Sequence, residues 1–316
     1  MTYELFDPAL LELAAEQRDH NAKLMELTAA MSAIDTTTPE GIKWVRDAME
    51  PGGAFGFSAL DFPEDRTIPG DLPIRVYTPE RVRGVYLHLH GGAMTVGSAK
   101  SMDLRNWAFA QALDCAVVSV DYRLAPEHPY PAGPDDCEAA ALWLLDNAMA
   151  EFGTDRLVMG GESAGAYFTA LTMLRLRDRG VGGYLAMDLC YGVYDLSGTP
   201  STRLQIGKVP YASDMTAQKV MYAPGRDLQG LRDPALSPMW AELHGLPPAI
   251  LTVGTADWLL DESILFAGRL AAAGNEVELA VYPEGPHGVE SMPTELGRTA
   301  SRRIHDFLGG KLDAAP

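Results

Sequence analysis

The 316-residue chain has little cysteine, few basic residues and no long apolar run, and each shortage excludes a class of protein. The three cysteines, Cys115, Cys137 and Cys190, are scattered along the chain. Two of them lie in apolar runs, so buried free thiols are favoured over disulfides or metal ligands. No apolar stretch approaches the length of a membrane span, and the acidic start of the chain is unlike a signal peptide. We therefore expect a cytoplasmic protein that does not enter a membrane.

The charge balance excludes a nucleic-acid partner and limits the substrate. Lysine and arginine number 25 against 43 acidic residues, which gives a formal net charge of −18. No basic stripe is present that could follow a phosphate backbone. An acidic surface also repels anions at long range, so a neutral small molecule is the expected substrate.

From residue 83 onward, strand-like and helix-like segments alternate, which predicts parallel strands joined by crossover helices. Continuous apolar runs are typical of strands that are buried on both faces. The expected strands are 54–62, 72–79, 83–92, 115–123, 156–163, 183–192, 248–257 and 276–285. Two segments fall outside the alternation: about 1–50, helical over 8–32 and 38–50, and about 195–235. Both are long enough to fold over one end of the sheet.

A serine, Ser163, stands between Gly161 and Gly165 where a strand passes into a helix. This is the G-x-S-x-G pattern of a nucleophile elbow, in which a sharp turn presents the hydroxyl at the carboxyl end of the strand. We expect this turn to be crowded, which explains the glycines, because a side chain at either position would strike the neighbouring strand or helix. The N-terminus of the following helix favours a developing negative charge.

A serine nucleophile needs a base and an orienting carboxylate. Of the seven histidines, His287 follows the last strand in a glycine-bounded loop at the carboxyl end of the sheet. Asp257 follows the preceding strand in the same way, and the order Ser163, Asp257, His287 is that of α/β-hydrolases. Asp261 is a rival carboxylate that we expect to cap the next helix instead.

The stretch "HGGA", 90–93, follows the third strand and predicts an oxyanion hole. Its glycines let backbone N–H groups approach a ligand without an intervening Cβ. We expect the N–H groups of Gly91, Gly92 and Ala164 to form the hole. His90 is then a residue that fixes the loop.

Together these residues resemble the hormone-sensitive-lipase-like family of α/β-hydrolases, the bacterial family IV esterases, over about residues 72–309. The matching motifs are "HGGA" (90–93), "DYRLAPEHPYPA" (121–132), "GESAGA" (161–166), "DWLLDE" (257–262) and "HGV" (287–289). The resemblance implies an α/β-hydrolase fold: an eight-stranded, mostly parallel sheet flanked by helices, with a helical cap. Residues 1–50 would supply cap helices, and 51–316 would form the catalytic domain with a cap insertion at about 195–235.

The family resemblance also implies hydrolysis of short-acyl carboxylic esters without metal or cofactor. Ser163 would attack the carbonyl, His287 would carry the proton to the leaving alcohol, and Asp257 would hold the imidazole. Water would release the acyl group. The motif at 121–132 is expected to be structural, with Asp121 and Arg123 in a buried polar network that braces the oxyanion loop. We also expect a cis bond at Tyr130–Pro131.

The chain departs from the family pattern at four positions. Ala93 replaces a third glycine, Glu162 replaces an aspartate, Trp258 replaces a proline and Val289 replaces a phenylalanine. Trp258 would either narrow the acyl pocket or pack under the cap, and Val289 would widen the same region. The candidate substrate-pocket residues are Met94, Tyr194, Tyr211, Met215, Trp258 and Val289.

Other functions remain open at this point. His88 and His90 stand two apart on a strand, as a zinc pair would, but no third ligand cluster such as H-E-x-x-H accompanies them. Amide, lactone or carbamate hydrolysis would use the same triad. Plant gibberellin receptors, which bind a ligand without catalysis, resemble the family but lack the catalytic histidine. A homodimer is possible.

Overall fold

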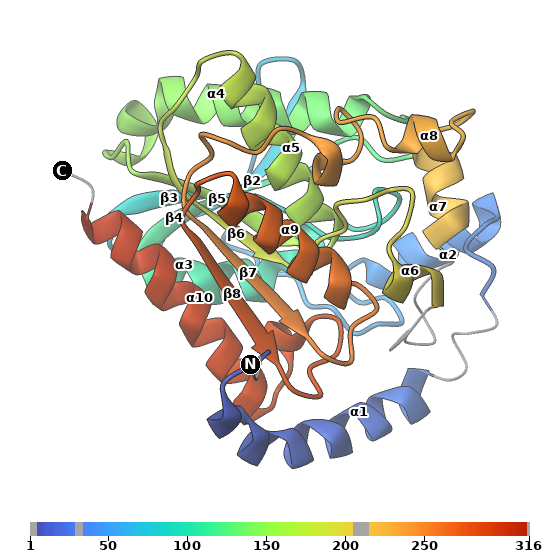
Figure 1. Cartoon of the computed structure of the whole chain (residues 1–316). Coiled ribbons are helices and arrows are strands. Elements are labelled where there is room, and N and C mark those ends of the chain that lie inside the picture. The colour runs from blue at the N-terminus through green and yellow to red at the C-terminus, as the bar shows by residue number, and fades with distance from the viewer. Residues whose placement is uncertain (1–4, 29–33, 205–214, 315–316) are drawn as a thin grey trace.

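An eight-stranded sheet runs through the molecule, whose computed structural model describes residues 5–28, 34–204 and 215–314 (Figure 1). Its strands are β1 (Glu64–Ile68), β2 (Leu72–Tyr77), β3 (Gly84–Leu89), β4 (Cys115–Val120), β5 (Leu157–Glu162), β6 (Tyr184–Cys190), β7 (Ala249–Gly254) and β8 (Val277–Tyr282). The spatial order is β1-β2-β4-β3-β5-β6-β7-β8. Strand β2 runs antiparallel to both of its neighbours, β1 and β4, and all other neighbouring pairs are parallel. The predicted mostly parallel sheet is thus confirmed.

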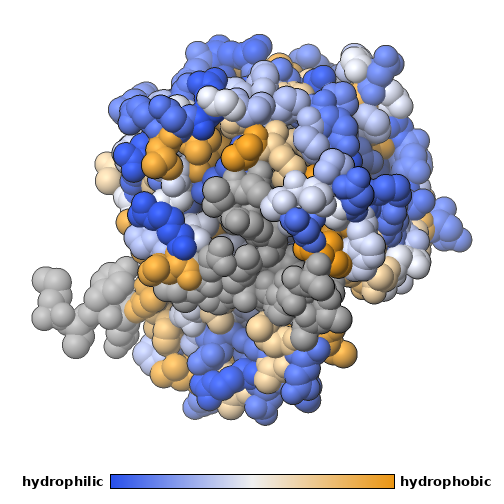
Figure 2. All heavy atoms as spheres, turned by 90° about the vertical axis from the view of Figure 1, so that its right-hand side faces the viewer, coloured by the Kyte–Doolittle hydropathy of each residue, from blue (hydrophilic) through white to orange (hydrophobic). Residues whose placement is uncertain are grey.

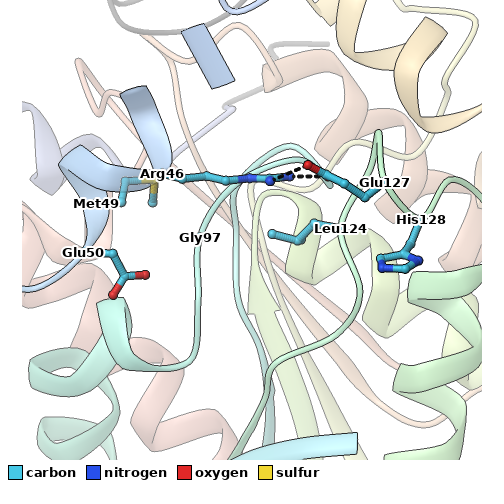
Figure 3. Close-up of a pocket in the computed structure, with 7 residues that line it drawn as sticks. All are labelled: Arg46, Met49, Glu50, Gly97, Leu124, Glu127 and His128. Carbon is cyan, nitrogen blue, oxygen red and sulfur yellow. Dashed lines mark hydrogen bonds and ion pairs between the residues drawn. The ribbon is translucent and has the colours of Figure 1, made fainter. Parts of the chain in front are cut away.

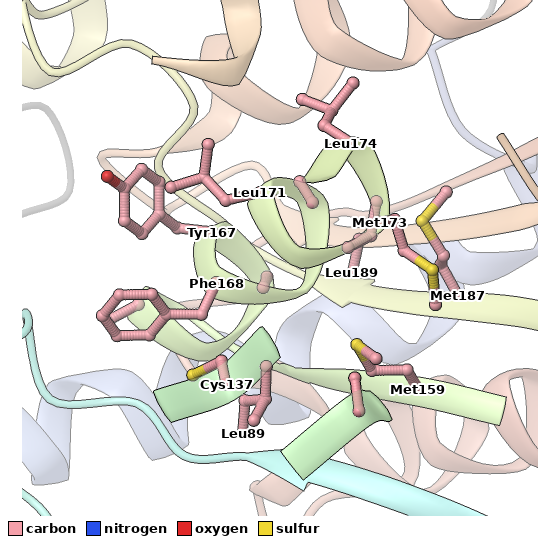
Figure 4. Packing of buried hydrophobic residues seen from close by; sticks show 14 of the residues in the cluster. Leu89, Cys137, Met159, Tyr167, Phe168, Leu171, Met173, Leu174, Met187 and Leu189 are labelled. Atoms are coloured by element: carbon pink, nitrogen blue, oxygen red, sulfur yellow. The ribbon is translucent and has the colours of Figure 1, made fainter. Parts of the chain in front are cut away.

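Two layers of helices cover the sheet. One face carries α4 (Ala132–Phe152), α5 (Ala164–Asp178) and α9 (Leu260–Ala272), and the other carries α3 (Asp103–Leu113) and α10 (Glu295–Ala314) (Figure 1). The side chains of α5 are buried along almost its whole length, packed against β3, β5 and β6 (Figure 4). The helix behind Ser163 is therefore held by the core over several turns.

The strand order reverses between β3 and β5, because the chain leaves β3 toward β4 and then crosses to β5 on the other side. In open α/β sheets a crevice forms outside the carboxyl ends of the strands at such a point. Gly91 and Gly92 follow β3 there, and Ser163 follows β5. The topology alone brings the predicted oxyanion loop beside the predicted nucleophile.

The predicted strand at 54–62 is wrong, since the first strand is β1. Residues 50–56 form turns, with Gly53 N–H donating to Glu50 and Gly56 N–H to Gly53. The alternating phenylalanines pack outside the sheet, where Phe55 meets Trp44 of α2 (Pro39–Met49) edge-on at 5.9 Å. The start of α2 follows the prediction, because Thr38 caps it and Pro39 opens it.

The short helix η1 (Pro8–Leu13) and α1 (Ala14–Thr28) begin the described chain and lie against its last third. Asn21 Nδ2 donates to the backbone oxygen of Glu284 at 2.8 Å, in the loop that follows β8. Gln17 is completely buried and accepts a hydrogen bond from Thr294 Oγ1 at 2.6 Å. The loop that carries His287 is therefore held on both sides of the histidine by α1.

Between β6 and β7 the described chain forms α6 (Pro200–Leu204), α7 (Met215–Tyr222), α8 (Leu228–Leu231) and the short η4 (Pro238–Trp240). Helices α2, α6, α7 and α8 lie on the right side of the molecule in Figure 1. Figure 2 shows several separate groups of hydrophobic side chains on this face. The exposed large hydrophobic residues of these helices include Trp44, Leu204 and Val220. That these helices close over the site as a cap stays a prediction. Within the described ranges, no helix is long and apolar enough to cross a membrane.

Candidate active site

Ser163 occupies a strained turn between β5 and α5. Its backbone has φ 56° and ψ −114°, which a side-chain-bearing residue adopts only when its surroundings enforce it. Its N–H donates to the backbone oxygen of Cys190, at the end of β6, at 2.9 Å. A Cβ at Gly161 would lie 2.0 Å from the backbone oxygen of Leu89, and one at Gly165 would lie 1.8 Å from it. The predicted crowding of this turn is confirmed.

His287 and Asp257 meet at the carboxyl ends of β8 and β7. Nδ1 of His287 lies 2.9 Å from Asp257 Oδ2, and the other carboxylate oxygen accepts from the N–H of Leu259 at 2.8 Å. The Asp257 side chain is fully buried, whereas that of His287 is 16% exposed. No hydrogen bond joins Ser163 Oγ to the imidazole in the described part of the chain. Hydrogen bonds to a nucleophile are often long before substrate binds.

Two aromatic rings fix the plane of the imidazole. Trp258 stacks on His287 with ring centroids 4.2 Å apart and planes 29° apart. Tyr191 meets the same ring edge-on at 4.5 Å. Tyr191 directly follows Cys190, whose backbone oxygen accepts from the N–H of Ser163, so the histidine and the serine turn both contact the end of β6.

The loop after β3 differs from the prediction in which N–H groups it leaves open. Gly91 N–H donates to Glu162 Oε1 at 2.8 Å, so the expectation that it serves the oxyanion hole is wrong. The N–H groups of Gly92 and Ala93 have no acceptor among the described residues. Both residues have positive φ, 125° and 51°, and a turn from Gly92 to Val96 follows them. That the N–H groups of Gly92 and Ala164 form the oxyanion hole stays a prediction.

Glu162 is a buried carboxylate directly before Ser163. Burial would raise its pKa, but the charge of Arg105, the ring of His88 and the N–H of Gly91 lower the pKa to about 2. His88 Nε2 lies 3.0 Å from Glu162 Oε2, and Nδ1 lies 2.8 Å from Ser119 Oγ. Because both nitrogens have partners, His88 is unsuited to the metal pair considered from the sequence. No cluster of three or more metal-ligating side chains occurs in the described ranges.

His90 fixes the same loop, as expected. Its ring stacks on Tyr122 with centroids 4.2 Å apart, and Tyr122 OH donates to the His90 backbone oxygen at 2.5 Å. Asp121 accepts from the N–H of Ala99 at 2.6 Å and thus braces the far end of the loop. Arg123, however, is exposed and pairs with Asp136 at 2.7 Å, so its predicted place in a buried network is wrong. The Tyr130–Pro131 bond is cis, as is Ala125–Pro126.

Asp261 lies in the first turn of α9, as expected, but the start of this helix has no side-chain capping hydrogen bond. Asp261 accepts from Ser201 N–H at 2.8 Å and from Thr199 Oγ1 at 2.6 Å, and so holds the start of α6. Its neighbour Glu262 is fully buried and accepts from the N–H groups of Tyr194 and Asp195. Burial raises the pKa of Glu262 to about 7, although these two hydrogen bonds oppose the rise. The "LLDE" segment therefore anchors the chain after β6.

Most of the predicted pocket residues belong to the core. Tyr194 is fully buried and stacks on Phe266 of α9, and Val289 is enclosed beside α10, so their predicted role in a substrate pocket is wrong. Met94 retains 3% exposure and packs with the core of the α4 and α5 face. Tyr211 and the side chain of Met215 lie outside the described residues. Of the predicted pocket residues, Trp258 lies beside the site, where its ring stacks on His287.

A cleft of about 440 Å³ lies between α2, the loop after β3 and the loop after β4, and none of the predicted pocket residues lines it (Figure 3). Its lining includes Leu124, His128 and Glu50. Arg46 of α2 spans it, donating to the Thr95 backbone oxygen at 2.8 Å and pairing with Glu127 at 2.8 Å. Since Thr95 belongs to the loop after β3, this arginine ties α2 to that loop.

Sequence reasoning missed a buried cluster of charge behind the site. Arg105 of α3 lies within 4 Å of three carboxylates, those of Glu162, Asp188 and Glu290. The only sequence signal was a single basic residue within the predicted helix "LRNWAFAQALD". Its partners come from three other segments, which no local pattern connects.

Known proteins are similar to this chain over most of its length. A family model described as alpha/beta hydrolase fold matches residues 86–291. A carboxylesterase of Mycobacterium tuberculosis, NlhH, is 38% identical over 239 residues, covering 71% of this chain and 74% of the relative. An arylesterase of Saccharolobus solfataricus is 36% identical over 249 residues, covering 76% and 74%. A crystal structure of a hormone-sensitive lipase from a metagenome library superposes with a TM-score of 0.82 at 26% identity, covering 94% of this chain and 98% of that one.

Proposed function

We propose that Ser163 is the nucleophile of a carboxylic ester hydrolase, because the chain belongs to the hormone-sensitive-lipase-like family of α/β-hydrolases. The relatives named carboxylesterase and arylesterase support ester hydrolysis. The observation that carries the serine mechanism is the His287–Asp257 pair at 2.9 Å, two residues that sit at strand ends on the same edge of the sheet as the strained Ser163 turn.

In this mechanism Ser163 Oγ attacks the ester carbonyl while Nε2 of His287 takes the hydroxyl proton. Asp257 accepts from Nδ1–H, which keeps the imidazole in the tautomer whose Nε2 is free to act as a base. His287 then donates the proton to the leaving alcohol, and an acyl group remains on Ser163. Water, activated by the same imidazole, releases the acid.

The tetrahedral intermediate carries a negative oxygen that needs donors. The N–H of Ala164 lies at the start of α5, where the helix dipole is positive. We assign the other donors to Gly92 and Ala93 because Gly91 is already bonded to Glu162. Glu162 thereby fixes the loop at its first glycine and leaves the next two N–H groups for substrate.

The substrate is a neutral ester with a short acyl group. The net charge of −18 disfavours anionic substrates at long range. The rings of Trp258 and Tyr191 flank the imidazole and limit the space beside the reacting atoms. Both points agree with what the family resemblance implies.

Hydrolysis of p-nitrophenyl esters, from acetyl to dodecanoyl, tests the proposal in three proteins: wild type, Ser163→Ala and Ser263→Ala. Ser263 is a buried serine of α9 whose Oγ has no hydrogen-bond partner among the described residues, so it is a matched control. We expect turnover that falls with chain length, persists in Ser263→Ala and is lost by about 10³-fold or more in Ser163→Ala. Undiminished turnover in Ser163→Ala would refute the serine mechanism.

A further inference from the structure

Arg105 carries a buried positive charge that makes no hydrogen bond. Its side chain is 12% exposed, and its three guanidinium nitrogens are buried without a hydrogen-bond partner among the described residues. Nη2 lies 3.6 Å from Glu162 Oε2 and 3.9 Å from Asp188 Oδ2, and Nε lies 3.8 Å from Glu290 Oε1. These distances are too long for hydrogen bonds but short enough for strong ionic attraction in a buried site.

Each of the three carboxylates belongs to a segment that positions a different part of the site. Glu162 directly precedes Ser163 and holds the N–H of Gly91 in the oxyanion loop. Asp188 lies on β6, two residues before Cys190, whose backbone oxygen holds the N–H of Ser163. Arg105 therefore faces both segments that shape the nucleophile turn.

Glu290 extends the same connection to the base. It accepts a hydrogen bond of 2.6 Å from Tyr191 OH, and the ring of Tyr191 lies edge-on against His287. Glu290 also lies on η5 (Val289–Ser291), directly after the "HGV" motif. The histidine loop is thus connected to Arg105 through Tyr191 and through its own chain.

No other cation near the cluster can replace this arginine. Among the described residues, Arg105 is the only lysine or arginine within ion-pair distance of Glu162, Asp188 or Glu290. The nearby imidazoles are His88, His90 and His305. Burial lowers the pKa of all three, that of His305 to about 4, which favours their neutral forms near pH 7. A buried carboxylate without a cation carries a large desolvation cost.

We propose that Arg105 is a positioning residue of the active site, whose charge holds the nucleophile turn, the oxyanion loop and the histidine loop in one arrangement. This inference rests on the serine mechanism proposed above. Because the guanidinium makes no directed hydrogen bond, its charge matters more than its fork geometry. A lysine at this position should therefore retain the function that an uncharged side chain loses.

The test compares kcat and KM of wild type, Arg105→Met, Arg105→Lys and Arg175→Met with p-nitrophenyl butyrate. Arg175 is a matched control, since it pairs with Asp135 and Glu138 between α5 and α4, away from the catalytic loops. We expect Arg105→Met to lose about 10- to 100-fold in kcat with KM within about threefold, as for a catalytic group displaced by about 1 Å. Arg105→Lys should stay within about fivefold of wild type, and Arg175→Met should keep wild-type kcat.

Three results would overturn the inference. These are wild-type kcat in folded Arg105→Met, equal losses in the methionine and lysine variants, and the same loss in Arg175→Met. If Arg105→Met does not fold, Tyr191→Phe replaces it, because the ring stays on His287 while the bond to Glu290 is lost; unchanged kcat there also overturns the inference. Activity in Ser163→Ala would instead refute the serine mechanism, so the two failures are distinguishable.

Discussion

Replacing Gly165 by alanine tests how tightly the start of α5 packs against the end of β3. A Cβ there would lie 1.8 Å from the backbone oxygen of Leu89 and 2.7 Å from its carbonyl carbon. Neither atom belongs to a flexible side chain, so β3 and α5 would have to separate by about 1 Å or more. Overpacking of this kind costs about 1–3 kcal/mol.

Gly268 offers a control in the same protein. It lies within α9, and a Cβ there would meet nothing within 4 Å. Alanine stabilises a helix interior by about 1 kcal/mol relative to glycine, so Gly268→Ala should raise the free energy of unfolding by up to that amount. Gly165→Ala gains the same helix term but incurs the overpacking cost, so it should lower the free energy of unfolding by about 0–2 kcal/mol net and lie about 1–3 kcal/mol below Gly268→Ala.

The two substitutions should also differ in activity. Leu89 precedes the oxyanion loop, so its displacement moves the loop away from Ser163, and a 1 Å shift in such geometry costs about 100-fold in rate. Urea unfolding followed by circular dichroism measures the stability, and p-nitrophenyl acetate hydrolysis measures kcat. If Gly165→Ala is as stable and as active as Gly268→Ala, the nucleophile turn does not depend on contact with β3 and the reasoning is refuted.

Three further predictions follow from other contacts. Folding raises the pKa of Glu262 to about 7, so its contribution to stability is full below its unfolded pKa and is lost as the pH rises through 7. The urea concentration at the unfolding midpoint should therefore be lower at pH 8.5 than at pH 5.5, and this difference should be smaller in Glu262→Gln. Arg46→Ala should cost about 1–3 kcal/mol in thermal unfolding, against at most about 0.5 for Lys43→Ala on the same helix, whose partner is exposed. Trp258→Leu should lower kcat by about 3- to 30-fold, because the stacked ring no longer stabilises the protonated His287, and an unchanged kcat would contradict this.

The sequence was sufficient for the parts of the site that depend on chain order. Ser163, Asp257 and His287 each follow a parallel strand, and parallel strands place their carboxyl ends on one edge. The meeting of His287 with Asp257 could therefore be predicted without any contact information. The crowding at Gly161 and Gly165 follows in the same way from a sharp turn beside a neighbouring strand.

Features that depend on side-chain direction were not predictable. The prediction for Gly91 was wrong because the carboxylate of Glu162 points back to the oxyanion loop and accepts a hydrogen bond from the glycine's N–H. Tyr194 turned into the core because Phe266 of a distant helix offers a stacking surface. Arg105 was not identified because its three carboxylates come from β5, β6 and η5, and only the folded sheet brings them together.

The contacts of α1 have a consequence for how the protein is made. Its hydrogen-bond partners lie 263 and 277 residues farther along the chain, at Glu284 and Thr294. Chains emerge from the ribosome N-terminus first, and contacts between distant segments form late. Helix α1 must therefore wait until these later segments have been synthesised before it can dock. Until then the loop around His287 lacks one of its supports, so a nascent chain cannot hold this histidine in its final place before residues 284–294 have been made.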